Sequence, residues 1–248
     1  MFGRNKKGKT ASNANMILST LSSWEIREAY KSLRTNVMFL IDGDKSKVIG
    51  VTSATPHDGK TINAINHAIS FAQIGKKTVL IDADMRLPTV AGKLRMAHKI
   101  GLSNYLAGQN KLEECIKKSK KYGIDVLPSG TIPPDPTWLL QSDRFAKMID
   151  DLKLEYDYII VDLPPVTTVA DAYIISGFID GYLLVIRNGQ TDIRAVDDMM
   201  EQLSMANAKV IGFINNDVQG GTGTYYKKRY YDKSRYYSSS GKEETKEL

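Results

Sequence analysis

Short apolar runs alternate with amphipathic stretches along most of this chain. The apolar runs are rich in Val, Ile and Leu, each is closed by Asp, Asn, Pro or Gly, and they cover residues 46–54, 78–84, 124–130, 156–165, 181–188 and 208–216. Between them, apolar side chains recur at helical spacing in residues 63–75, 142–155 and 192–206. Continuous apolar strands that alternate with helices are typical of a parallel sheet covered by helices on both faces.

This pattern predicts a single α/β domain over residues 25–218, built on a mainly parallel, twisted sheet. The Gly-rich stretch at residues 220–224 predicts a hinge. We therefore expect residues 219–248 to form a flexible, tyrosine-rich tail. Residues 1–24, which begin with a run of basic side chains, are expected to form an N-terminal arm.

Composition narrows the class of protein. Of 248 residues, 42% are hydrophobic and 25% are charged, which is ordinary for a globular protein. Cys115 is the only cysteine, so no intrachain disulfide can form and a reducing compartment is expected. No apolar run approaches the roughly 20 residues that span a bilayer, and no secretory signal follows the basic N-terminus. We expect a soluble intracellular protein, whose net charge of +6 permits phosphates, anionic lipid or nucleic acid as partners.

The first apolar run leads into a stretch with the spacing of a phosphate-binding loop. Ala54, four further residues and then Gly59-Lys60-Thr61 match a Walker A loop in which Ala replaces the first Gly. Such a loop aims backbone N–H groups at an anion, and the following helix adds its positive end. Lys60 would reach the β- and γ-phosphates of ATP, and the Thr61 hydroxyl would bind Mg²⁺. The predicted nucleotide-binding residues are Ser53, Ala54, Thr55, Pro56, His57, Asp58, Gly59, Lys60, Thr61 and Ile62.

Carboxylates close two of the other predicted strands. Asp82 and Asp84 end one strand, two residues apart and therefore on one side of it, and Asp162 ends another in the form of a Walker B strand. Mg²⁺ takes one or two carboxylates and keeps several waters. Asp162, Asp84 and Thr61 are therefore the predicted metal ligands. The alternative interpretation is that these aspartates only terminate strands or cap helices.

The motifs together resemble those of the bacterial tyrosine kinases (BY-kinases) that govern capsule and exopolysaccharide synthesis. The similarity is greatest to their Gram-positive CpsD/CapB type, in which the kinase is a separate chain from its membrane activator. It is carried by "ATPHDGKT", "VLIDADMRLPT", "YIIVDLPPV", "EAYKSLRTNVMF", "GLSNYLAG" and "LPSGTIPPDP", and it covers about 190 residues. The resemblance implies a P-loop fold, ATP and Mg²⁺ as cofactors, and tyrosine as the phosphate acceptor.

The same resemblance implies individual roles. Lys60 takes the Walker A role, and Asp82 and Asp84 form the family's second acidic motif, with Asp82 as the candidate acceptor of the tyrosine proton. Arg86 would neutralise charge on the phosphate or the acceptor; the alternative is a salt bridge to a nearby Asp. Asn216 corresponds to a position that contacts adenine.

Two departures from related patterns affect the interpretation. Thr55 stands where switch ATPases of the MinD/ParA type carry a second lysine, which argues against their mode of dimer-activated hydrolysis. The family's ring-forming motif Glu-x2-Arg-x2-Arg here reads Glu28, Lys31 and Arg34, and Lys lacks the bidentate fork of Arg. These three residues are the predicted oligomerisation residues, and a plain amphipathic helix is the alternative.

The C-terminal stretch holds six of the thirteen tyrosines in three adjacent pairs, with five basic residues and one acid among them. After a Gly-rich hinge, such a segment could reach the active site of a neighbouring copy, which predicts autophosphorylation in trans. The predicted acceptors are Tyr225, Tyr226, Tyr230, Tyr231, Tyr236 and Tyr237. The expected partners are a membrane-anchored activator of the polysaccharide co-polymerase type, other copies in a ring, a cognate tyrosine phosphatase and exogenous protein substrates. The activator would recruit this cytoplasmic chain to the inner face of the membrane.

Two other functions fit parts of the sequence. Basic residues interleaved with aromatic rings also suit single-stranded nucleic acid, which would make the chain a ParA-like, DNA-binding ATPase. The missing lysine at Thr55 and the "DMRLPT" stretch argue against that function. A non-catalytic, ATP-gated scaffold at the membrane is the third possibility.

Overall fold

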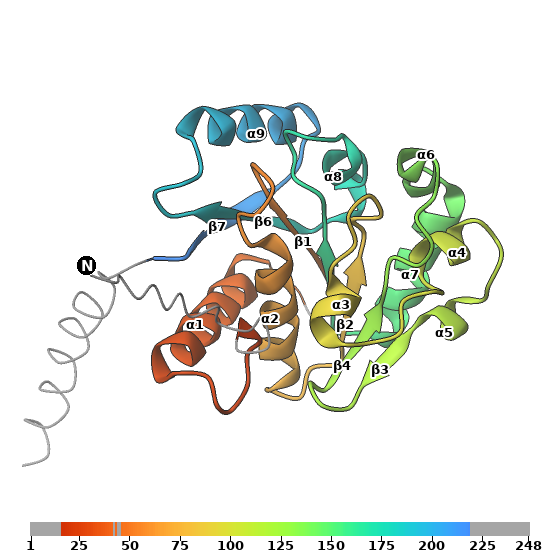
Figure 1. Ribbon diagram of the computed structural model, residues 1–248, viewed down its shortest axis with the longest axis horizontal. Helices are drawn as coiled ribbons and strands as arrows, with labels where there is room; N and C mark the ends of the chain where they lie inside the picture. The colour runs from red at the N-terminus through yellow and green to blue at the C-terminus, as the bar shows by residue number, and fades with distance from the viewer. Residues whose placement is uncertain (1–15, 42, 44–45, 219–248) are drawn as a thin grey trace, which may run out of the picture.

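The computed structural model describes residues 16–41, 43 and 46–218, and in this part of the chain a seven-stranded sheet forms the centre (Figure 1). The strand order is β3-β4-β2-β5-β1-β6-β7, and every neighbouring pair is parallel except β3 with β4. The strands are β1 (Lys47–Ser53), β2 (Thr78–Asp82), β3 (Lys117–Ser119), β4 (Ile124–Leu127), β5 (Tyr158–Asp162), β6 (Gly181–Arg187) and β7 (Val210–Asn216).

Helices cover both faces of this sheet (Figure 1). The described helices are α1 (Trp24–Leu40), α2 (Lys60–Ala72), α3 (Val90–Leu94), α4 (Leu102–Leu106), α5 (Leu112–Cys115), α6 (Pro136–Leu140), α7 (Asp143–Glu155), α8 (Asp171–Ile174), η2 (Ser176–Phe178) and α9 (Ile193–Met205). Side chains of α1, α2 and α3 pack on one face, and those of α4 to α9 pack on the other. The predicted fold class is therefore confirmed.

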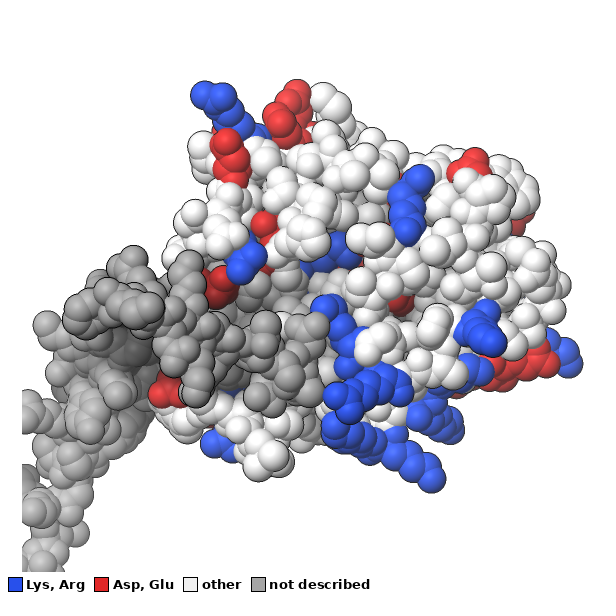
Figure 2. Space-filling view, in the orientation of Figure 1, with Lys and Arg blue, Asp and Glu red and all other residues white. Residues whose placement is uncertain are grey.

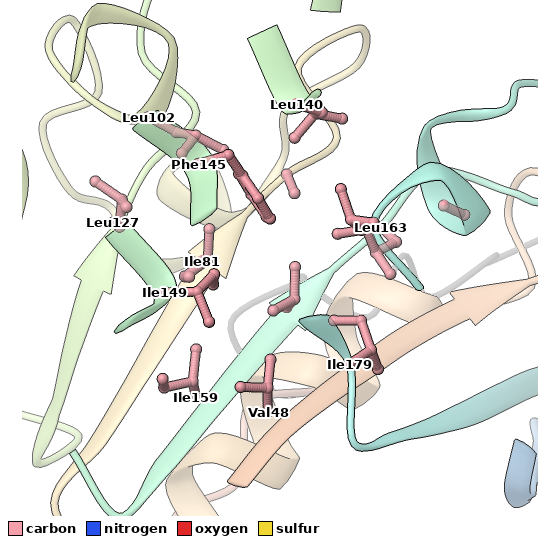
Figure 3. Close-up of a cluster of buried hydrophobic side chains, with 14 of the residues drawn as sticks. Val48, Ile81, Leu102, Leu127, Leu140, Phe145, Ile149, Ile159, Leu163 and Ile179 are labelled. Atoms are coloured by element: carbon pink, nitrogen blue, oxygen red, sulfur yellow. The ribbon is translucent and has the colours of Figure 1, made fainter. Parts of the chain in front are cut away.

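The alternation of side chains along each strand produces two separate cores. Val48 of β1 and Ile81 of β2 point toward Phe145 of α7, whereas Ile49 and Leu80 point toward α2. Figure 3 shows the first of these cores, with side chains of the strands facing those of α7. Because both faces are buried, the strands read as continuous apolar runs in the sequence.

The parallel pairing brings the carboxyl ends of the central strands to one edge of the sheet. Asp82, at the end of β2, lies directly opposite Asp162, at the end of β5. The loop after β1, which leads into α2, lies at the same edge. Ligands of open parallel sheets bind at this edge, beyond the strand ends.

The observed elements differ from the predicted ones in detail. All six predicted strands and three predicted helices are present with slightly shifted ends, and the stretch that follows Ser23 is helical as α1. Pattern alone did not predict β3 or the helices of four or five residues, since these are too short for a period to be visible. The boundary predicted at residue 25 also leaves out Ile17 and Leu18, although both are buried against α2 and its neighbours. Among the described residues, no helix is both long and apolar enough to cross a membrane.

Candidate active site

The loop between β1 and α2 is held in shape by Asp58, which is almost completely buried. Its carboxylate accepts hydrogen bonds from the Thr55 amide (2.9 Å) and hydroxyl (3.0 Å) on one oxygen and from the Thr191 hydroxyl (2.8 Å) on the other. The amide of Asn216 donates to the Asp58 carbonyl at 2.8 Å. The loop is thus tied to the segment after β6 and to the last residue of β7, and sequence patterns gave no sign of Thr191.

Gly59 ends the loop in a left-handed conformation (φ 101°) and directly precedes α2. A Cβ atom there would lie 2.1 Å from the side-chain nitrogen of Asn216, so no larger residue fits without movement of that side chain. The predicted contact of Asn216 with adenine stays a prediction. What the structure adds is that Asn216 braces the phosphate loop.

Lys60, the first residue of α2, lies between two carboxylates. Its Nζ is 2.8 Å from Asp84 Oδ2 and 3.7 Å from Asp162 Oδ1. Burial lowers the pKa of Lys60, but attraction to Asp162 and Asp84 outweighs it and leaves the pKa raised. Lys60 is therefore a cation, held at the mouth of the phosphate loop.

Three of the four oxygens of the two opposed carboxylates have no hydrogen bond among the described residues. Asp82 Oδ1 and both oxygens of Asp162 are buried without a hydrogen bond among the described residues, and only Asp82 Oδ2 accepts one, from the Val90 amide (3.1 Å). Burial and the charge of Asp162 raise the pKa of Asp82; burial also raises that of Asp162, although Lys60 opposes it. Orphaned carboxylate oxygens are costly unless a cation or a proton reaches them.

These oxygens fit a magnesium ion. The Thr61 hydroxyl accepts hydrogen bonds from Thr89 Oγ1 (3.2 Å) and Lys60 Nζ (3.4 Å) and so lies within the same polar cluster as Asp84 and Asp162. The described residues contain no group of three or more His, Cys, Asp or Glu that would bind a metal alone. Mg²⁺ in nucleotide sites does not need one, because phosphates and water complete its octahedron.

The side chain of Arg86 forms a salt bridge with Asp171. Its guanidinium forms two hydrogen bonds with the fully buried Asp171 (2.8 and 3.2 Å) and a third with the Thr137 hydroxyl (3.0 Å). Thr137 in turn donates to Asp171 at 2.7 Å. The salt bridge that the sequence left open as the alternative to a catalytic role is therefore present. Neither Thr137 nor Asp171 carried a sequence signal.

The predicted oligomerisation residues on α1 do not share one environment. Lys31 pairs with Glu28 at 2.6 Å on the outer side of the helix, and its side chain is 55% exposed. Arg34 instead donates to the Ser70 carbonyl of α2 at 2.7 Å. The six tyrosines predicted as acceptors lie outside the described residues.

Comparison with known proteins agrees with this geometry. An AAA domain family matches residues 46–219. The tyrosine-protein kinase CpsD of Streptococcus agalactiae serotype III is 39% identical over 199 residues, which cover 80% of this chain and 85% of that protein. The tyrosine-protein kinase YwqD of Bacillus subtilis is 38% identical over 189 residues, 76% and 80% of the two chains.

Solved structures show the same fold. The chimerical protein CapA2B2 superposes with a TM-score of 0.78 at 32% identity, covering 84% of this chain and 91% of its own. The kinase domain of the Escherichia coli tyrosine kinase ETK gives a TM-score of 0.74 at 32% identity, with coverage of 79% and 78%. This chain belongs to the bacterial tyrosine-protein kinases, a family built on the P-loop ATPase fold.

Proposed function

We propose that the chain is a protein-tyrosine kinase that uses ATP and Mg²⁺ to phosphorylate tyrosines of its own residues 225–237, and that it regulates capsular or exopolysaccharide synthesis and export. One observation carries this proposal: Lys60 at the phosphate loop faces Asp84 and Asp162 at 2.8 and 3.7 Å, beside orphaned carboxylate oxygens. Its relatives from Streptococcus and Bacillus, named as tyrosine-protein kinases, support it.

The binding step depends on the loop and on Lys60. Backbone N–H groups at the start of α2 would bind the β- and γ-phosphates, and Lys60 would turn from Asp84 toward them. Thr61, Asp84 and Asp162 would hold Mg²⁺, which supplies charge neutralisation at the phosphate oxygens. Phosphoryl transfer depends mainly on such positioning and neutralisation.

The transfer step needs a proton acceptor. The tyrosine oxygen forms a bond to the γ-phosphorus, the bond from that phosphorus to the ADP oxygen breaks, and the hydroxyl proton passes to Asp82. Burial and the charge of Asp162 raise the pKa of Asp82, whereas Lys60 opposes this rise and the proposed Mg²⁺ would oppose it further. With nucleotide and Mg²⁺ bound, Asp82 would thus be ionised, and its raised pKa would make it a better base than an ordinary carboxylate. Arg86 serves the site indirectly, by anchoring the segment that follows Asp84 to Asp171.

Phosphorylation would change the charge of the segment that carries the acceptors. Each phosphate adds about −1.5 to −2 at pH 7, so three or four would more than cancel the five basic residues of 225–237. A ring of copies would be assembled before this change and separated by it. On α1, Glu28, Lys31 and Arg34 are the residues proposed to contact a neighbouring copy; one nitrogen of Arg34 also donates to the Ser70 carbonyl of α2 in its own chain.

The proposed partners extend beyond the ring. A membrane-anchored activator of the polysaccharide co-polymerase type would recruit the chain to the inner face of the cell membrane. A cognate tyrosine phosphatase would reverse the modification, and exogenous proteins would be further substrates. Nucleic acid is not a proposed partner.

The test is direct. Purified protein, with and without the cytoplasmic segment of the activator, is incubated with ATP and Mg²⁺, and phosphotyrosine is mapped by mass spectrometry. We expect phosphate on residues 225–237, its loss in Lys60→Met, and no change in the control Lys118→Met on the exposed edge strand β3. ATP hydrolysis without phosphotyrosine under both conditions would contradict the proposal and favour a switch ATPase; ATP binding without either reaction would favour the scaffold.

A further inference from the structure

A groove of about 330 Å³ lies between α4, the loop after β4 and α6. Apolar side chains dominate its lining, and two of them are largely open to solvent: Trp138 is 67% exposed and Ile132 is 61% exposed. Pro133 and Pro134 form part of the same wall. Concave, mostly apolar surfaces of this size are typical of binding sites.

The groove is built rigidly. Asn104 Oδ1 accepts hydrogen bonds from the Gly101 amide (3.1 Å) and the Thr131 amide (3.3 Å), and its Nδ2 donates to Gln109 (2.9 Å). A Cβ on Gly101 would lie 2.0 Å from the Pro128 carbonyl oxygen, and Gly130 has φ 82°. Only glycine at these positions lets the loop lie against α4, so the groove exists before any ligand arrives.

One wall of the groove is joined to the carboxylate cluster. Thr137, next to the groove residue Trp138, is hydrogen bonded to Arg86, which follows Asp84 by two residues. Figure 1 shows α6 and α8 at the same edge of the sheet as the loop that leads into α2. A chain seated in the groove would therefore run toward the place where a phosphate acceptor must lie.

The charge of the groove indicates which kind of peptide segment would bind there. Its lining includes Asp135 and no Lys or Arg. Figure 2 shows the surface over α4 and α6 largely uncharged, while basic side chains gather lower on this face, around α3 and β4. Such a groove suits a segment that combines aromatic rings with cations, because rings pack on Trp and Pro and the cations approach Asp135 and the carboxylate cluster.

The chain itself carries a segment of this chemistry. Residues 225–237 hold six tyrosines, five basic residues and one acid, and thirty residues follow Val218, which lies two residues beyond the end of β7. Five strand spacings separate β7 from β4, about 24 Å. Twelve extended residues span up to about 40 Å, so the length suffices to reach a groove.

We propose that this groove is an acceptor-docking site, which seats an aromatic ring of residues 225–237 while a tyrosine of the next pair faces the carboxylates. The pairs at Tyr225, Tyr230 and Tyr236 are five or six residues apart, a reach of up to about 20 Å in extended chain. The proposal rests on the proposed kinase function and adds a site for substrate recognition. Once phosphorylated, the segment would bind less well, because it would bring anions toward Asp135.

The test separates acceptor recognition from chemistry. The enzyme copy carries Ser in place of its six tail tyrosines, so that it offers no rings of its own, and the acceptor is full-length Lys60→Met protein. We expect Trp138→Ala and Ile132→Ala in the enzyme copy to raise the KM for the acceptor about tenfold, with kcat and the KM for ATP unchanged. The control is Leu154→Ala on α7, which removes an equally apolar side chain that is 87% exposed. An unchanged KM for the acceptor in both groove variants would overturn the docking site.

A binding measurement keeps this result distinct from failure of the kinase function. A fluorescent peptide of residues 223–239 is titrated into the same enzyme copies and followed by anisotropy, which requires no phosphotransfer. We expect Trp138→Ala to weaken peptide binding about tenfold and the Leu154→Ala control to leave it unchanged. Equal affinity of the peptide for Trp138→Ala and for unmodified protein would overturn the docking site even if kinase activity is present. Absence of phosphotyrosine with intact peptide binding would instead reject the kinase function alone.

Discussion

The carboxylate cluster and the groove beside α6 lie at the same edge of the sheet, yet their buried polar groups differ in whether they have hydrogen-bond partners. At the cluster, three buried oxygens of Asp82 and Asp162 have no hydrogen bond among the described residues. At the groove, the buried Asn104 uses both its oxygen and its nitrogen. Unsatisfied buried groups cost stability and are kept where a ligand completes them; satisfied ones hold a shape. The cluster is thus poised for a cation and a phosphate, and the groove for a ring.

The largest expected effect is a loss of phosphotransfer caused by a substitution in the carboxylate cluster. Asp162→Asn keeps the size of the side chain but removes a charge that faces Lys60 and the proposed Mg²⁺. We expect phosphotransfer to fall about 100- to 1,000-fold, because charge stabilisation at the transferred phosphate is lost. The assay is transfer of labelled phosphate to Lys60→Met acceptor protein. Asp157→Asn, at the opposite end of β5, is the control; equal losses in both variants would refute the assignment.

The second largest expected effect is a loss of stability caused by a substitution in the wall of the groove. Gly101→Ala places a Cβ 2.0 Å from a backbone carbonyl that cannot move freely, and we expect unfolding free energy to fall by about 3 kcal/mol. Gly92→Ala is the matched control, since nothing lies within 4 Å of its Cβ position inside α3. Urea unfolding followed by circular dichroism measures both. Equal stability of the two variants would mean that the groove wall is not locked.

The same contrast explains what the sequence could predict. The motif around Lys60 and the acids at strand ends were visible because chemistry restricts both residue type and spacing, and buried parallel strands appear as apolar runs. Thr191, Thr137 and Asp171 were not visible, because their roles depend on contacts between segments far apart in the chain. The groove could not be predicted for the same reason: "GLSNYLAG" and "LPSGTIPPDP" were visible as motifs, but only the fold shows that their Gly101, Asn104 and Gly130 meet and form its wall. The salt bridge of Arg86 was only one of two open interpretations until Asp171 was located.

A third prediction concerns a buried polar group outside both regions. His67 of α2 is fully buried, and neither of its ring nitrogens is hydrogen bonded to any residue that the structure describes. Burial, with a smaller effect of Arg34, lowers its pKa to about 3. Below pH 6.5 His67 is protonated in the unfolded chain but stays neutral in the folded chain. His67 therefore makes the stability of the fold decrease as pH falls toward 3. Between pH 7 and pH 5 this loss is about 2 kcal/mol. His67→Met should remove it.

The measurement is urea unfolding at the two pH values. The exposed His98→Met serves as the control and should retain the full pH dependence of the unmodified protein. If His67→Met loses as much stability between pH 7 and pH 5 as the unmodified protein does, His67 is charged or hydrogen bonded in the fold. This would place it with the satisfied groups of the groove rather than with the orphaned groups of the cluster.

The smallest expected effect concerns Asp82 in the carboxylate cluster. Its effect on how stability depends on pH has the opposite sign to that of His67. Burial and the neighbouring Asp162 raise the pKa of Asp82, so the folded state holds a proton that the unfolded state releases, and stability is lost as pH rises above about 4. Asp82→Asn carries no charge, and its oxygen can still accept from the Val90 amide. We expect a gain of about 1 kcal/mol at pH 7.5 without nucleotide or Mg²⁺, and none near pH 4. Kinase assays on the same variant should show reduced transfer. A gain in stability together with a loss of activity would show that Asp82 serves the reaction although it destabilises the fold. A loss of stability would instead mean that a positive group inside the cluster stabilises the charge of Asp82.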